Sequence, residues 1–214
     1  MVLLGRRVAP LEKLYDEIEA LGAPQPAIYP MNLEGATPAD FAELGARIID
    51  GCGRLDGVIH AAGRLHGLTP IEQFEPEEWL RTLQVGVNAP FLLLQALLPA
   101  LKASSSAPAA LFFVDEIERA TRAYWGAYGV GQAALRALIG MTANEWNEQG
   151  VRVMGVLPAP LASAFRRKAL VGESAEGLVA PRVYAELATW LLAHAPMSFS
   201  GALVDARQLP AASH

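Results

Sequence analysis

The stretch Asp56-Gly57-Val58-Ile59-His60-Ala61-Ala62-Gly63 decides the fold class. Its short apolar centre is typical of a strand buried on both faces, and the small residues after it allow a close approach of the backbone to another group. Similar short apolar runs recur on both sides of it. The expected strands are Val2 to Leu4, Ala27 to Met31, Gly57 to Ala61, Leu111 to Val114, Val151 to Leu157 and Ala202 to Val204.

Longer segments of helical period separate these runs, which predicts βαβ units that feed a parallel sheet in an α/β fold. Thr37 is the expected N-cap of the second helix. Pro90 predicts that the third ends or bends near Ala89. The expected helices are Pro10 to Leu21, Pro38 to Asp50, Pro76 to Ala103, Ala127 to Gln149 and Pro181 to Ala195.

Length and composition narrow the class of protein. The 214 residues predict one domain over residues 1–214, and a formal net charge of −5 without a basic block argues against a nucleic-acid partner. One cysteine, Cys52, and four scattered histidines predict neither a disulfide nor a metal site. No signal peptide or long apolar run is recognised, so we expect a cytoplasmic protein without a membrane partner.

The segment 158–178 is expected to be a long irregular loop. It is rich in glycine and alanine and carries the basic group Arg166-Arg167-Lys168. A loop of this length in an α/β domain is typically functional, so we expect it to cover a substrate site.

The motif Trp125-Gly126-Ala127-Tyr128-Gly129-Val130-Gly131-Gln132 is the most informative local pattern. Together with Ala61-Ala62-Gly63, Val87-Asn88-Ala89 and Leu157-Pro158-Ala159-Pro160, it resembles the short-chain dehydrogenase/reductase family. The resemblance runs from residue 1 to about residue 207. It implies a Rossmann-like, doubly wound, mostly parallel sheet with helices on both faces. It also implies hydride transfer between NADP(H) and a small carbonyl or alcohol substrate.

The same resemblance assigns the catalytic positions. In the family the tyrosine exchanges a proton with the substrate oxygen, a lysine four residues later lowers its pKa, and a serine thirteen residues earlier polarises the carbonyl. These positions are Tyr128, Gln132 and Asp115 here, and Asn88 takes the place of an asparagine that holds a water for proton relay. His60 is a candidate that we interpret as a core residue.

The resemblance also assigns cofactor contacts. Arg6 or Arg7 would face the 2′-phosphate that distinguishes NADP from NAD, since a guanidinium binds phosphate at two points. Two solvated charges at a helix start are the alternative interpretation. The remaining cofactor-binding candidates are Asn32 and Leu33 at the adenine, Ala61, Ala62 and Gly63 beside the nucleotide, and Pro158 and Ser163 at the nicotinamide.

Two catalytic positions depart from the family pattern. Gln132 has no charge, whereas an ammonium about 5 Å from the phenol is worth about 3 kcal/mol at an effective dielectric of about 20, or roughly two pKa units. Asp115, when ionised, only accepts hydrogen bonds, so it would repel the oxygen that a serine hydroxyl stabilises. The sequence therefore predicts impaired catalysis.

A third departure concerns the phosphate-binding turn. No glycine follows Gly5 until Gly22, so the glycine-rich turn that opens the family fold is absent from this sequence. We expect the fold to lack the first βα unit, of about 30 residues, whose strand lies in the middle of the family's sheet.

Three functions stay open at this point. The first is an NADP(H)-dependent oxidoreductase with weak activity or none. The second is a non-catalytic relative that acts as an interaction protein, since the family's long helices form homodimers and homotetramers and carry apolar stripes here. The third, a flavodoxin-like binding module, shares the architecture, but residues 6–10 do not supply its anion-binding loop.

Overall fold

Six short strands carry the fold, and every ladder between neighbouring strands is parallel. The structure, a computed structural model, describes residues 1–207, so the last seven residues of the predicted domain lie outside it. The strands are β1 (Val2–Gly5), β2 (Ala27–Pro30), β3 (Gly57–His60), β4 (Ala109–Phe113), β5 (Arg152–Pro158) and β6 (Leu203–Ala206).

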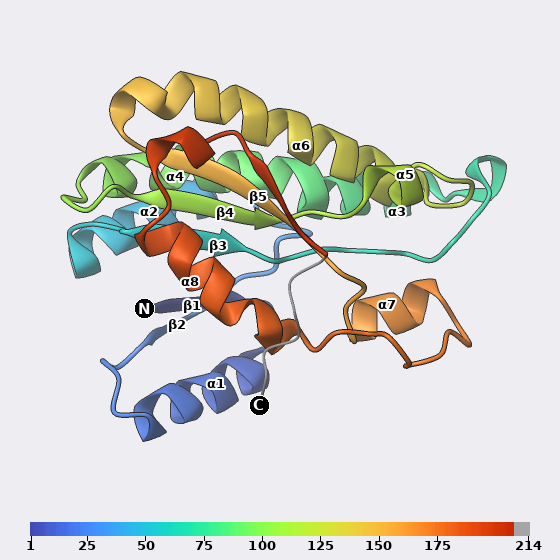
Figure 1. Ribbon diagram of the computed structural model, residues 1–214, viewed down its shortest axis with the longest axis horizontal. Helices are drawn as coiled ribbons and strands as arrows, with labels where there is room; N and C mark the ends of the chain where they lie inside the picture. Colours follow the sequence, from blue (N-terminus) through green and yellow to red (C-terminus); the bar gives the residue numbers. More distant parts are fainter. Residues whose placement is uncertain (208–214) are drawn as a thin grey trace.

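Helices cover both faces of these strands (Figure 1). Helices α2, α4 and α6 lie on one face, α1 and α8 lie on the other, and α5 and α7 lie near the carboxyl ends of the strands. The doubly wound α/β architecture predicted from the sequence is confirmed. The helices are α1 (Val8–Ala20), α2 (Pro38–Cys52), α3 (Pro76–Leu83), α4 (Ala89–Lys102), α5 (Ile117–Ala120), α6 (Gly126–Trp146), α7 (Ala164–Ala169) and α8 (Ala185–Ala193).

The strands form two separate sheets. One contains β1 and β2, and the other has the order β3-β4-β5-β6. The division lies between β1 and β3. The middle strand of the family's sheet, which the sequence predicts to be missing, would lie at this place. Val2 and Leu4 of β1 nevertheless pack with Phe41 and Leu44 of α2 in the main core, so α2 joins the two sheets. Helix α1 is held more loosely, because residues 8–20 include no fully buried side chain.

Local signals explain most helix ends. The Thr37 hydroxyl accepts a hydrogen bond from Asp40 N at 3.4 Å, and the Asp40 carboxylate accepts one from Thr37 N at 2.7 Å, so the two form a capping box at the start of α2. Helix α2 ends at Gly53, whose φ of 71° favours glycine. The break predicted near Ala89 is a π-helical turn, Gln84–Asn88, between α3 and α4, with Pro90 in the first turn of α4.

The helical run Pro76–Lys102 is long and apolar enough to cross a membrane by length and composition, although no such run was recognised in the sequence. In the structure its residues Leu94, Leu97 and Leu101 are buried in the main core, beside α2 and the sheet. A core helix of an α/β domain has the same composition, and we interpret the run in this way.

One segment that the sequence predicts to be irregular is partly helical. The segment 158–178 was expected to be irregular but contains α7, which begins after Ser163, the residue whose hydroxyl caps it.

Arg152 is fully buried at the start of β5 and donates hydrogen bonds to the carbonyls of Leu191, Leu192 and Ala195 at 2.6 to 2.8 Å. A guanidinium suits this place because helix carbonyls at the end of α8 carry partial negative charge.

His60 ends β3 inside the core. Its ring lies 5.6 Å from that of Phe112, and its Nε2 has no hydrogen-bond partner among residues 1–207. Burial lowers the pKa of His60 from 6.5 to about 4. The fold therefore holds the neutral imidazole, as expected of a core histidine.

This burial predicts a pH-dependent stability. The unfolded chain binds a proton at His60 near pH 6.5, whereas the folded chain does so only near pH 4. The stability is therefore complete above pH 6.5 and is lost as the pH falls toward 4. We expect the His60 contribution to lower the free energy of unfolding by about 2 kcal/mol between about pH 7 and about pH 5.

Urea unfolding at the two pH values measures this loss. The variant His60→Leu should lose less stability between them than the wild-type chain. The control His194→Leu, at an exposed position, should retain the wild-type loss. Equal losses in His60→Leu and in the wild-type chain would contradict the assignment.

Candidate functional site

A cleft of about 340 Å³ lies at the carboxyl ends of β3, β4 and β5, where ligands bind in doubly wound sheets. It contains most of the residues that the sequence analysis singled out. Its described lining includes Ala61, Ala62, Gly63, Phe113, Asp115, Glu116, Arg119, Trp125, Tyr128, Gln132, Pro158, Ala159, Leu161, Ser163, Phe165, Arg166 and Arg207.

Tyr128 and Asp115 form the centre of the cleft. The Tyr128 hydroxyl donates a hydrogen bond to Asp115 Oδ2 at 2.8 Å. Tyr128 lies in the first turns of α6, and Asp115 follows β4. Gly129 lets α6 pack closely against the end of α5, because a Cβ there would lie 1.9 Å from the Ala120 carbonyl oxygen. The two positions that the resemblance pairs as tyrosine and serine are therefore adjacent, with a carboxylate in place of the alcohol.

The electrostatics of this pair keep the phenol protonated. Burial raises the pKa of Tyr128 well above its ordinary value of 10, and the neighbouring Asp115 carboxylate raises it further. The guanidinium of Arg119 acts in the opposite direction but more weakly. Arg119 also forms an ion pair with Asp115 and lies 5.0 Å from the centre of the Trp125 ring. A tyrosinate at this site is therefore strongly disfavoured.

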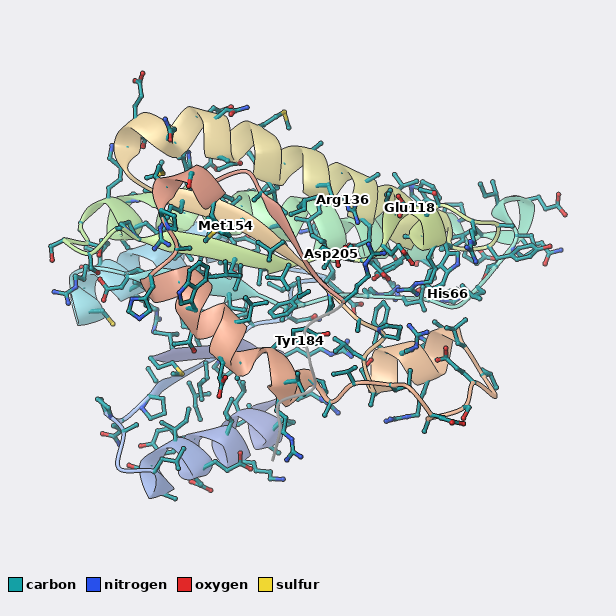
Figure 2. All side chains as sticks on the ribbon, in the orientation of Figure 1. His66, Glu118, Arg136, Met154, Tyr184 and Asp205 are labelled. Atoms are coloured by element: carbon teal, nitrogen blue, oxygen red, sulfur yellow. The ribbon has the colours of Figure 1, made fainter. Side chains whose placement is uncertain are left out.

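Gln132 is turned toward the protein backbone. Its Oε1 accepts a hydrogen bond from Asp115 N at 2.7 Å, and only the oxygen of an amide can do so. One turn later on α6, Arg136 donates to the Asp115 carbonyl oxygen. Figure 2 shows Arg136 extending from α6 toward the sheet. Gln132 and Arg136 thus hold the chain at Asp115, and Gln132 supplies no positive charge to Tyr128.

Aromatic rings surround the phenol. The centroid of the Phe165 ring, on α7, lies 5.0 Å from that of the Tyr128 ring. The Trp125 ring, from the residue just before α6, lies 5.6 Å from the Tyr128 ring. Trp79 lies outside the described lining of this cleft and instead lines a second cavity with Tyr124 and Val130. The aromatic wall of the cleft is therefore formed by Phe165, Tyr128 and Trp125.

The segment after β5 forms another wall. Pro158 and Ser163 line the cleft as expected, and Ala159 N donates a hydrogen bond to the Tyr184 hydroxyl at 2.8 Å. The Ser163 hydroxyl accepts one from Arg166 N at 3.1 Å, so it caps α7. Figure 2 shows Tyr184, which anchors this segment, beneath the end of the sheet.

The N-terminal candidates lie outside the cleft lining. Arg6 is exposed and forms a 3.0 Å ion pair with Glu34. Arg7 is exposed before α1 and has no ion pair within residues 1–207. Asn32 Oδ1 accepts a hydrogen bond from Glu34 N at 3.3 Å, and Leu33 packs against the main core.

Asn88 is the last residue of the π-helical turn and is exposed. Its Nδ2 donates a hydrogen bond to Gln84 Oε1 at 2.9 Å, and it does not belong to the described lining of the cleft. The structure therefore places Asn88 at a helix bulge, as the resemblance implies, but does not bring its side chain to Tyr128.

Sequence reasoning missed the ion pairs that neutralise the site. Arg119 follows Asp115 by four residues, a spacing that signals a pair once a helix is expected there. Arg207 pairs with Glu116 and with Asp205 beside it, and Figure 2 shows Asp205 at the carboxyl end of β6. Glu34 contacts both Arg6 and Arg64. No local sequence pattern predicts the pairs of Arg207 with Glu116 and of Glu34 with Arg6 and Arg64, because these residues lie far apart in the chain.

The described residues fit NADP(H) at its two ends. At one end, the small residues Ala61, Ala62 and Gly63 line the cleft, and small side chains allow a ligand to approach the backbone. At the other end, Arg6 and Arg7 follow β1. Their side chains are exposed to solvent, where a guanidinium can bind the phosphate of a ligand. Between these ends, residues 1–207 contain no glycine-rich turn to hold a pyrophosphate.

Comparison with known proteins identifies related chains. A family model described as short chain dehydrogenase matches residues 1–173. The uncharacterized oxidoreductase YciK of Escherichia coli (strain K12) is 32% identical over 207 residues, which cover 97% of this chain and 81% of that protein.

Solved structures agree with this match. A short chain dehydrogenase from Salmonella enterica serovar Typhi superimposes with a TM-score of 0.89 at 30% identity, over 95% of this chain and 84% of that one. A protein from Escherichia coli CFT073, solved in complex with NADPH, has a TM-score of 0.88 at 32% identity over the same shares of the two chains. The protein belongs to the short-chain dehydrogenase family, whose members are oxidoreductases of this fold.

Proposed function

We propose that this protein is an NADP(H)-dependent oxidoreductase of carbonyl and alcohol compounds in which catalysis is slow. The observation that carries the proposal is the hydrogen bond from Tyr128 to the Asp115 carboxylate, at 2.8 Å in the cleft. The NADPH complex of a relative with a TM-score of 0.88 supports the choice of cofactor. When bound, NADPH supplies a hydride to a carbonyl carbon.

Tyr128 is the only group of the central pair that can give a proton to a carbonyl oxygen. Its hydroxyl already donates a hydrogen bond to Asp115. Transfer of that proton to a substrate oxygen would leave a tyrosinate beside a carboxylate. Two unit charges about 3 Å apart cost about 6 kcal/mol at an effective dielectric of about 20, which the nearby Arg119 offsets in part. The barrier to proton transfer is therefore high.

Cofactor affinity is the second weak point. We propose that Arg6 and Arg7, which follow β1 and precede α1, face the 2′-phosphate of NADP(H). The Glu34 carboxylate beside Arg6 also competes with an incoming phosphate.

Alkaline titration of tyrosine absorbance tests the electrostatics of the pair. Because Asp115 raises the pKa of Tyr128, we expect Asp115→Ser to bring one additional tyrosine into the titration at a lower pH than in the wild-type chain. The double variant Asp115→Ser, Tyr128→Phe should lose that additional tyrosine. Superimposable titrations of wild type and Asp115→Ser would count against the proposal.

Restoring the family residues tests the catalytic defect. We expect Asp115→Ser with Gln132→Lys to raise kcat for NADPH-dependent ketone reduction by about 10²-fold, the usual size of an acid–base contribution. NADPH oxidation measures the rate, and NADPH fluorescence shows that the cofactor is bound.

The triple variant that adds Tyr128→Phe is the matched control and should lose the gain. Two results oppose the proposal. One is rapid ketone reduction by the wild-type chain, and the other is an unchanged rate in the double variant with NADPH bound.

A second candidate function, a homodimer-forming interaction protein, is favoured by exposed apolar side chains on the long helices. Leu80 of α3, Phe91 of α4, and Val130 and Met141 of α6 are about half exposed or more. Leu94 of α4 and Trp146 of α6 are, in contrast, buried in the core. The exposed members are those that a partner copy would cover.

Sedimentation velocity tests this candidate. We expect the wild-type chain to sediment as a dimer or tetramer, and Phe91→Glu with Met141→Glu to shift it to the monomer, because charges buried at an interface are costly. Leu21→Glu, at an exposed position beyond α1, is the control and should leave the assembly intact. A wild-type monomer would exclude the candidate.

A further inference from the structure

We propose that the cleft binds an electrically neutral carbonyl compound bearing an aromatic ring, and that Phe165 is the residue that selects the ring. This inference rests on the proposed function, because it assigns a substrate class to the same cleft. Three features of the structure support it: the stacked rings beside Tyr128, the position of Phe165 on α7, and the ion pairs that surround the cleft.

The rings form a continuous wall. Phe165, Tyr128 and Trp125 follow one another with centroid separations of 5.0 and 5.6 Å and interplanar angles of 48° and 39°. All three side chains belong to the lining of the cleft. Leu65 and Ala169 are buried in the same cluster as these rings. A planar apolar group packs on such a wall better than a flexible chain does, because aromatic pairs gain energy beyond their buried area.

Phe165 joins the two chemically important sides of the cleft. Its ring contacts the Tyr128 ring, and its Cε2 lies 3.5 Å from the place of a Cβ on Gly63. The aromatic ring of a ligand that packs on Phe165 therefore lies next to the phenol. A carbonyl substituent on that ring comes within reach of the Tyr128 hydroxyl, the group that would protonate it.

The charges around the cleft disfavour an anionic ligand. Arg119 pairs with Asp115, and Arg166 donates two hydrogen bonds to the Glu173 carboxylate, both at 2.6 Å. Arg207 pairs with both Asp205 and Glu116.

Every guanidinium in the described lining is therefore already paired with at least one carboxylate. A carboxylate or phosphate ligand would have to break one of these pairs to gain a charge partner. A neutral ligand leaves the pairs intact.

Equilibrium binding to the full chain tests the proposal without relying on turnover. Isothermal titration calorimetry compares acetophenone, its anionic analogue 4-acetylbenzoate and its saturated analogue cyclohexyl methyl ketone. We expect acetophenone to bind about tenfold more tightly than either analogue.

Variants at position 165 show whether acetophenone binding requires an aromatic ring there or only an apolar side chain. Phe165→Leu keeps an apolar side chain and should weaken acetophenone binding about fivefold without affecting the saturated ketone. Phe165→Tyr keeps the ring and should retain the preference. Trp190→Ala removes a partly exposed ring on α8, outside the described lining, and should change nothing.

The outcomes are distinct from those of the proposed function. Tighter binding of 4-acetylbenzoate, equal binding of the two neutral ketones, no binding of any of the three, or an unchanged preference in Phe165→Leu would each overturn the inference. If the wild-type chain binds acetophenone as expected but the Asp115→Ser, Gln132→Lys variant does not reduce it with NADPH bound, the inference stands and the proposed function fails.

Discussion

The carboxylate of Asp115 is the point on which the geometry of the cleft depends. It accepts a hydrogen bond from Tyr128, pairs with Arg119, and lies on a backbone held by Gln132 and Arg136. These contacts join the end of β4 to α5 and α6 as one unit. The contacts that hold the chain in place at this site include the contact with Asp115 that keeps the phenol protonated.

Much of this site could be predicted from the sequence, because it depends on short-range rules. Tyr128 and Gln132 are four residues apart on one helix and face the same side. Asp115 follows a buried strand, so it had to lie at the carboxyl edge of the sheet, where ligands bind. The alternation of apolar runs and helical segments likewise predicted the six strands and the long helices, with differences of a few residues at their ends.

Other features were beyond prediction because they depend on distant partners. Helix α7 forms where composition indicated an irregular loop, and it begins just after Ser163, whose hydroxyl caps it. The pairing of Arg6 with Glu34 joins residues that are 28 apart, and the burial of Arg152 depends on carbonyls about 40 residues away. The partners of the Arg6 and Arg152 side chains are brought near them only by the tertiary structure, so these contacts could not be predicted from the sequence.

The loose attachment of β1, α1 and β2 has a consequence for ligand binding. Strand β1 pairs only with β2 among the described strands, and α1 buries no side chain completely within residues 8–20, so this segment can open locally at a smaller free-energy cost than global unfolding. Arg6, Arg7 and Asn32 lie on or beside it, whereas Tyr128 belongs to the four-stranded part. A dinucleotide that spans both parts would oppose this local opening, and hydrogen exchange in residues 1–30 would then slow on binding.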